Sequence, residues 1–287
     1  MQFYGYFCEE MKNFCCLIIV GWLLSYTQAL WAQEPCGVVY YDLGGLYDTE
    51  PSPFGGDEAY LPEGSLAWGV ERYEAALDRY AALIDTLAMP LVALFGVENE
   101  EVALALAARS RGDYAVVHRT SARRDGLDFA LLYQADRFLP GRVESDYGLL
   151  QIEGELMGRP VLLLLTNDPE AASERVEALC RFQERTPLIV LGNTGSFAKG
   201  APLCDALLLA ERAGRGTRLS RGGWWMRDRI WLGNEWEPLR ADVYADRMLF
   251  DEESGAPLPL YDRERYRGGW SRNLPVFLYF RAVNLEN

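Results

Sequence analysis

Short apolar runs that end in polar or glycine-containing turns recur along this 287-residue chain, and they alternate with helical patterns. Apolar side chains follow helical spacing from Trp68 to Leu87, Pro90 ends that pattern, and residues 91–95 are predicted to form a buried strand. Residues 149–156 and 161–165 flank a Gly-Pro-containing turn and predict a β-hairpin. Because hairpins are mixed with crossover helices, the pattern favours an α/β fold with mixed rather than all-parallel sheets.

The remaining segments complete the predicted order of elements. Further helices are expected at 98–111, 171–183 and 206–213, and further strands at 37–41, 114–117, 129–133, 188–191, 229–232 and 276–280. No internal repeat, heptad pattern or linker interrupts this order. The chain is therefore expected to form a single domain.

Composition limits the classes of partner. Hydrophobic residues make up 49% of the chain and aromatic residues 13%, which is sufficient for a well-buried core. The formal net charge is −14, and such a surface repels nucleic acid and anionic membranes. A nucleic-acid partner is therefore not expected.

The N-terminal residues have the pattern of an export signal. Lys12 precedes an almost wholly apolar run at 14–24, and small residues near 29–33 offer a cleavage site. We expect a signal peptide over residues 1–32, with Met11 as a possible true start, followed by one domain over 33–287. The protein is then periplasmic or extracellular. The alternative is an uncleaved signal anchor, the only membrane attachment expected.

Histidine and cysteine are scarce after residue 32. The single histidine, His118, leaves no second imidazole for a Ser-His-Asp triad or a multi-histidine metal site, and a structural role is expected for it. The cysteines are Cys36, Cys180 and Cys204, an odd number without a CxxC motif. This favours buried free thiols, although a Cys180–Cys204 bridge stays open.

Seven segments resemble, in their order, the endonuclease/exonuclease/phosphatase superfamily, especially its secreted bacterial members. They are VVYYDLGGLYDTE (38–50), GDEAYLPEGSLAWGVERY (56–73), GVENEEV (96–102), VHRTSARRDGLDFALLY (117–133), LIVLGN (188–193), WWMRDRIWL (224–232) and GGWSRNLPVFL (268–278). The resemblance covers about residues 38 to 280. It implies a four-layer α/β/β/α sandwich of two mixed sheets, and a cleft in which family members cleave phosphodiesters or phosphomonoesters with Mg²⁺.

The resemblance also shows which catalytic residues are replaced. Gly96 stands where the family has its metal-binding glutamate, and Asn273 stands where the general-base histidine would be. Asp228 alone is unchanged in the catalytic set. The positions that the resemblance assigns to the ancestral cleft are Asp42, Gly96, Asp125, Thr166, Asn167, Asn193, Gly195, Asp228, Arg272 and Asn273.

These substitutions predict a catalytically degenerate protein, a pseudoenzyme that acts as a binding or structural module without a cofactor. Its partner would be an unidentified protein or an anionic small molecule. The alternative is a divergent phosphodiesterase or nuclease in which Asp42, Glu98 and Asp228 form a rebuilt acidic site for Mg²⁺ or Mn²⁺. A third possibility is adhesion through an exposed aromatic face that includes Trp224, Trp225, Trp231 and Trp236.

Overall fold

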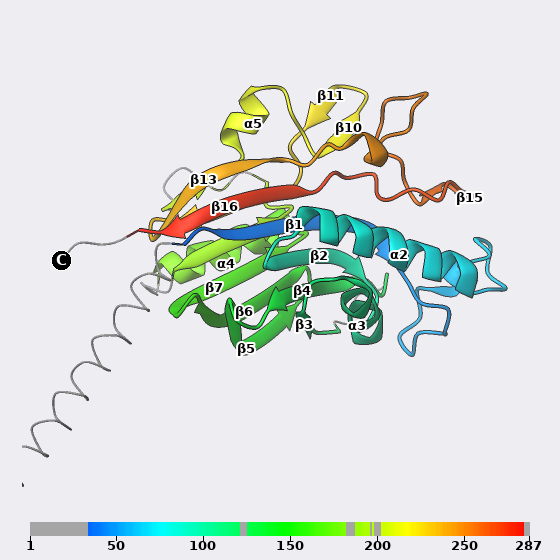
Figure 1. Cartoon of the computed structure of the whole chain (residues 1–287), viewed down its shortest axis with the longest axis horizontal. Coiled ribbons are helices and arrows are strands. Elements are labelled where there is room, and N and C mark those ends of the chain that lie inside the picture. Colours follow the sequence, from blue (N-terminus) through cyan, green and yellow to red (C-terminus); the bar gives the residue numbers. More distant parts are fainter. Residues whose placement is uncertain (1–33, 121–124, 182–186, 196, 198–201, 284–287) are drawn as a thin grey trace, which may run out of the picture.

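Two six-stranded mixed sheets pack face to face, and helices lie on their outer faces (Figure 1). The computed structural model describes residues 34–120, 125–181, 187–195, 197 and 202–283. The expected signal peptide, residues 1–32, lies outside the described residues. The predicted α/β sandwich of two mixed sheets in a single domain is confirmed.

The first sheet has the order β13-β16-β1-β2-β4-β3. Strands β1 and β2 are parallel, whereas β16 is antiparallel to both of its neighbours and β4 is antiparallel to β2 and β3. The C-terminal strand β16 therefore lies inside the sheet, beside the N-terminal strand β1. The bounds are β1 (Cys36–Leu46), β2 (Leu91–Val97), β3 (Tyr114–His118), β4 (Asp128–Gln134), β13 (Trp236–Val243) and β16 (Val276–Ala282).

The second sheet has the order β5-β6-β7-β8-β12-β9, in which only β7 and β8 are a parallel pair. Its strands are β5 (Phe138–Asp146), β6 (Leu149–Leu156), β7 (Arg159–Thr166), β8 (Leu188–Gly192), β9 (Leu203–Asp205) and β12 (Arg229–Gly233). Two small hairpins lie outside the sheets: β10 (Arg218–Ser220) with β11 (Gly223–Trp225), and β14 (Tyr261–Asp262) with β15 (Arg265–Tyr266).

The helices are amphipathic and cover the sheets. Along α2 (Val70–Leu87), the buried residues recur at helical spacing: Ala76, Leu77, Tyr80, Ala81, Leu83, Ile84 and Leu87. The other helices are α3 (Glu100–Arg109), α4 (Pro169–Arg181) and α5 (Leu208–Arg212), with the single turns η1 (Glu58–Tyr60) and η2 (Arg247–Leu249). Within the described residues, no helix is long and apolar enough to cross a membrane.

Strand β7 shows how the layers are built. Because alternate side chains of a strand point to opposite faces, Val161, Leu163 and Leu165 join the main core between the sheets. Leu162 and Leu164 instead belong to a second apolar cluster that includes Val176 and Leu179 of α4. A continuous apolar run is therefore needed here, since both faces of the strand are buried.

Several predicted bounds need correction. Trp68 is fully buried but precedes α2, and the second helix begins at Glu100, where the Asn99 side chain accepts a hydrogen bond from the Val102 N–H. The cysteines also differ from the prediction. All three are free, and Cys36 is buried, but Cys180 and Cys204 are exposed.

Candidate functional site

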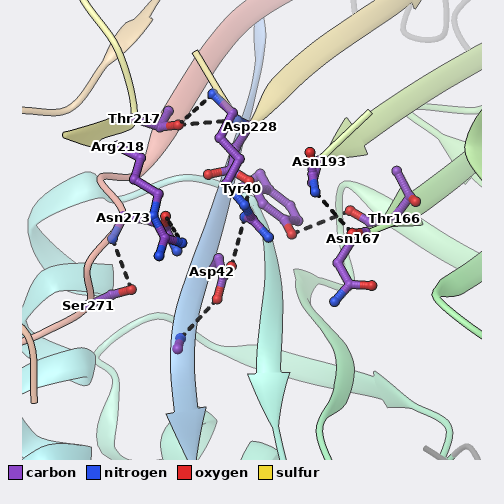
Figure 2. A network of polar contacts seen from close by, with 12 residues as sticks. Tyr40, Asp42, Thr166, Asn167, Asn193, Thr217, Arg218, Asp228, Ser271 and Asn273 are labelled. Atoms are coloured by element: carbon purple, nitrogen blue, oxygen red, sulfur yellow. Dashed lines mark hydrogen bonds and ion pairs between the residues drawn. The ribbon is translucent and has the colours of Figure 1, made fainter. Parts of the chain in front are cut away.

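Polar residues from six separate segments meet where strands of both sheets end (Figure 2). The Tyr40 hydroxyl of β1 donates to the Thr166 carbonyl of β7 over 3.5 Å and so links the two sheets. The Asn193 side chain, just after β8, donates to the Asn167 carbonyl over 3.1 Å. We call this group the strand-exit cluster: Tyr40, Asp42, Thr166, Asn167, Asn193, Thr217, Arg218, Arg227, Asp228, Ser271 and Asn273.

Two buried carboxylates and one arginine form the centre of the cluster. Nη1 of Arg227 lies 2.8 Å from Oδ2 of Asp42 and 2.6 Å from Oδ1 of Asp228. Asp42 is 5% exposed and Asp228 is 1% exposed. Among the described residues, Oδ2 of Asp228 has no hydrogen-bond partner. One cationic nitrogen atom therefore serves both acids.

Backbone contacts hold this arrangement in place. Oγ1 of the fully buried Thr217 accepts the N–H groups of both Arg227 and Asp228, each over 3.1 Å. Oδ1 of Asp42 accepts the Gly44 N–H over 2.9 Å. Burial raises the pKa of Asp228 to about 6 and raises that of Asp42, and in both cases the Arg227 charge opposes the shift.

Asn273 lies beside this centre at the start of β16. It is 3% exposed, and its N–H donates to Oγ of Ser271 over 3.1 Å. Nη1 of Arg218 lies 3.5 Å from Oδ1 of Asn273, at the limit of a hydrogen bond. A carboxamide and a guanidinium are both unable to accept a proton near neutral pH, so neither acts as a general base.

Gly96 lies at a bulge in β2, next to the irregular stretch of β1 that follows Asp42. Its φ is +87°, and a Cβ built there would lie 3.1 Å from the Gly45 nitrogen and 3.2 Å from the Gly44 nitrogen. Both the left-handed backbone and the close approach of β1 favour glycine. The backbone of Gly44 and Gly45 thus occupies the space into which a side chain at position 96 would project.

Glu98 is buried but belongs to a different group of contacts. Its Oε2 accepts the Asp48 N–H over 2.8 Å, in the loop that follows β1. Burial, together with the nearby charges of Asp48 and Asp57, raises the pKa of Glu98 to about 7. The structure therefore does not bring Glu98 together with Asp42 and Asp228 as the rebuilt acidic site requires.

Three other predicted positions lie at the margin of the cluster. The Arg272 side chain is half-exposed and pairs with Asp262 of β14 over 3.0 Å, away from the central carboxylates. The Asp125 carbonyl accepts the Tyr47 hydroxyl over 2.8 Å. Gly195 has a φ of +60° and packs against Pro169 at the start of α4. Arg272 thus supplies no charge to the centre.

The tryptophans do not form one aromatic face. Trp236 is 3% exposed and packs edge-on against Phe280, and the Trp231 indole donates to Oγ1 of Thr194. Trp224 packs against Phe250, whereas Trp225 is 46% exposed. The adhesion hypothesis required these side chains to lie on one surface, so it loses its main support.

Comparisons with known proteins agree with the fold. The sequence matches the family described as Endonuclease/Exonuclease/phosphatase over residues 37–172. Over these residues the chain is similar to the endonuclease/exonuclease/phosphatase family. No curated protein matches the sequence.

Solved structures extend this likeness in fold over most of the chain. TDP2 from C. elegans has a TM-score of 0.57 at 12% identity, covering 86% of this chain and 75% of that one. A family protein from Bacteroides thetaiotaomicron has a TM-score of 0.55 at 12% identity, covering 89% and 98%. A mannosyl-6-phosphatase from the same species has 0.54 at 15%, covering 85% and 99%. At these identities the likeness concerns the fold.

The residues present do not fit the Mg²⁺ site that the endonuclease/exonuclease/phosphatase family implies. A divalent cation needs several oxygen ligands, but the Arg227 guanidinium lies between Asp42 and Asp228, and backbone fills the space at Gly96. Within the part of the chain that the structure describes, no three or more His, Cys, Asp or Glu side chains are grouped to hold a metal.

Sequence reasoning did not assign five members of the strand-exit cluster to the site: Tyr40, Thr217, Arg218, Arg227 and Ser271. Arg227 directly precedes Asp228, which was the available signal, but an arginine at a strand exit is usually solvated. Thr217 and Arg218 gave no signal, because β10 is only three residues long and no hydrophobic pattern marks it. Their roles follow from tertiary contacts alone.

Proposed function

We propose that the protein is an exported endonuclease/exonuclease/phosphatase-family member that does not hydrolyse phosphoesters and binds a ligand through the strand-exit cluster. The observation that carries this proposal is the environment of Asn273. A buried carboxamide, with Arg218 as its neighbour, stands at the position where the family resemblance implies the general base. Hydrolysis needs a group that takes the proton of the attacking water, and neither side chain does so.

Two further features support the loss of activity. The metal-binding glutamate is replaced by Gly96, whose neighbourhood is filled by the backbone of Gly44 and Gly45. The Asp42 and Asp228 carboxylates are already bound to Arg227. Removing one member of a catalytic unit typically abolishes most of its rate enhancement, and here the base and the metal ligand are replaced together.

The Arg218 side chain favours an anionic ligand for this site. Its side chain is half-buried beside the cluster, and a guanidinium carries five N–H donors, of which the contact with Asn273 uses one. Arg227 and Arg218 together balance the charges of Asp42 and Asp228, so the centre does not repel an anion. An anionic small molecule, or a carboxylate on a partner protein, matches this donor. The net charge of −14 argues against a nucleic acid.

A hydrolysis assay tests the proposal against the alternative of a metal-dependent phosphodiesterase or nuclease. Purified protein is incubated with bis(4-nitrophenyl) phosphate and with 4-nitrophenyl phosphate, in Mg²⁺ and in Mn²⁺. The matched controls are Asp42→Ala and Asp228→Ala. We expect wild-type rates equal to those of both variants. Metal-dependent turnover that both substitutions abolish would contradict the proposal and establish the alternative.

A further inference from the structure

The contact between Arg227 and its two acids differs from an ordinary pair of salt bridges. A single nitrogen, Nη1, lies within 2.8 Å of oxygens from both Asp42 and Asp228. The Arg227 side chain is 12% exposed, and the two carboxylates are 6% and 1% exposed. The three groups are thus shielded from solvent and depend on one another.

Electrostatics explains why a cation must be present at this point. Two carboxylates that converge on one point out of water cannot both be ionised unless a positive charge lies between them. Taking one partner from such a buried set leaves an uncompensated charge, which is strongly destabilising. Arg218 adds positive potential nearby but makes no ion pair with either acid among the described residues. Arg227 is therefore the counter-ion of the pair.

The surrounding backbone keeps the three groups in register. Thr217 accepts the N–H groups on both sides of the Arg227–Asp228 peptide, and the N–H of Gly44, two residues further along β1, donates to Asp42. This frame does not involve the guanidinium. The two carboxylates would therefore stay close together if the guanidinium were removed.

We propose that Arg227 is a resident cation that takes the place of a divalent ion between Asp42 and Asp228, and that removing it converts the pair into a cation site. The native protein then needs no divalent metal to assemble the strand-exit cluster and binds none there. The new site has only two carboxylate ligands from the protein, because the Gly44–Gly45 backbone excludes a third at position 96. Water must complete the coordination of Mn²⁺ or Mg²⁺.

This inference goes beyond the proposed function, and the two can fail separately. Turnover that requires no metal would contradict the proposed function but would not contradict the inference that Arg227 is a resident cation. Mn²⁺ binding by the wild-type protein at Asp42 without any turnover would contradict the resident cation and leave the proposed function intact.

The test compares thermal unfolding of wild type and Arg227→Met, each in EDTA and in millimolar Mn²⁺. We expect the wild-type Tm to be the same in both. In EDTA, Arg227→Met should unfold about 5–10 °C lower, since a buried charge loses its partner. Mn²⁺ should raise the Tm of this variant by several degrees. Arg227→Lys, which keeps a cation, is the matched control and should not respond to Mn²⁺.

Asp42→Asn combined with Arg227→Met guards against a variant that fails to fold. This double variant lacks the charges of Arg227 and Asp42 and keeps that of Asp228. It is expected to be more stable in EDTA than Arg227→Met alone and to be insensitive to Mn²⁺. Electron paramagnetic resonance of Mn²⁺ titrated into wild type gives an independent reading, with no bound ion expected. A wild-type Mn²⁺ site that Asp42→Asn abolishes, or an Arg227→Met protein with equal Tm in EDTA and Mn²⁺, would overturn the inference.

Discussion

Glu98 is a buried acid whose surroundings oppose its ionisation. It is 4% exposed at the junction of β2 and α3, and its carboxylate faces the charges of Asp48 and Asp57. One hydrogen bond, from the Asp48 N–H, favours the ionised form, but burial outweighs it. Ionised Glu98 thus adds a local penalty to the folded state.

The pKa of Glu98 predicts the direction of a pH effect on stability. It is about 7 in the folded protein against 4.5 for a free glutamate, so the folded state binds more protons between these values. Stability from this group is therefore full below about pH 4.5 and falls as pH rises through 7. Glu98→Gln cannot ionise, and its side-chain oxygen can still accept the Asp48 N–H.

We expect urea unfolding of Glu98→Gln to show a shallower fall in stability than wild type between pH 5 and 8, and greater stability than wild type at pH 8. Asp48→Asn serves as the control, since it removes a neighbouring charge but leaves Glu98 titratable. Parallel stability curves for Glu98→Gln and wild type would show that Glu98 does not titrate in this range.

At the same scale, the candidate site was only partly accessible from sequence. The positions Asp42, Asn193, Asp228 and Asn273 were predicted, because the family resemblance assigns them to one cleft, and the structure brings them together. The sequence did not predict that the Arg272 side chain turns outward toward Asp262. That contact depends on the β14–β15 hairpin, whose strands are two residues each. Side-chain direction at a strand exit depends on neighbours distant in sequence.

At the scale of elements, the strands of the two large sheets that sequence patterns missed are the edge strands β5, β9 and β13. β5 and β13 lie at the edges of the two sheets, and most of their side chains are exposed or half-buried. Each contains a proline, Pro140 or Pro238, which edge strands tolerate. Interior strands such as β2, β7 and β8 are buried on both faces, so continuous apolar runs mark them.

The end of β8 is the most constrained point of the second sheet. Gly192 has a φ of +122°, and a Cβ there would lie 1.9 Å from the Thr166 carbonyl oxygen. That oxygen also accepts the Tyr40 hydroxyl and the Asn193 N–H. A side chain at position 192 would therefore separate β7 from β8 and disturb the strand-exit cluster.

Gly192→Ala is expected to lower the free energy of unfolding by about 3 kcal/mol, through backbone strain and overpacking. The matched control is Gly158→Ala in the turn between β6 and β7, where φ is +73° and no heavy atom lies within 4 Å. That variant should lose only about 1 kcal/mol, from strain alone. Equal losses in urea unfolding would show that the contact with Thr166 is relieved without cost.

At the scale of the whole molecule, the pattern of the N-terminal residues predicts export. The segment 1–32 has the order of charge, apolar run and small residues of an export signal, and it lies outside the described residues. The order of helices and strands predicted an α/β domain with mixed sheets, and the family resemblance supplied the four-layer sandwich. No pattern in the sequence predicted that β13 pairs with β16.

Export predicts a specific new N-terminus. Expressed with its full sequence in a bacterial host, the protein should be recovered from the periplasm or medium with a first residue near Gln33, as read by N-terminal sequencing or intact mass. Substituting apolar residues of the 14–24 run by aspartate should retain the uncleaved chain in the cytoplasm. Exported protein that still carries residues 1–32 would indicate an uncleaved anchor instead.

The position of β16 has a consequence for how the chain is made. Strand β16, which follows all the other strands described here, pairs with β1 on one side and β13 on the other, in the interior of its sheet. Until residues 276–282 are synthesised, β1 and β13 lack this shared partner, and Asn273 has no fixed place beside Arg218. The sheet and the strand-exit cluster are thus completed only after residues 276–282 have been synthesised, since their contacts join segments far apart in the sequence.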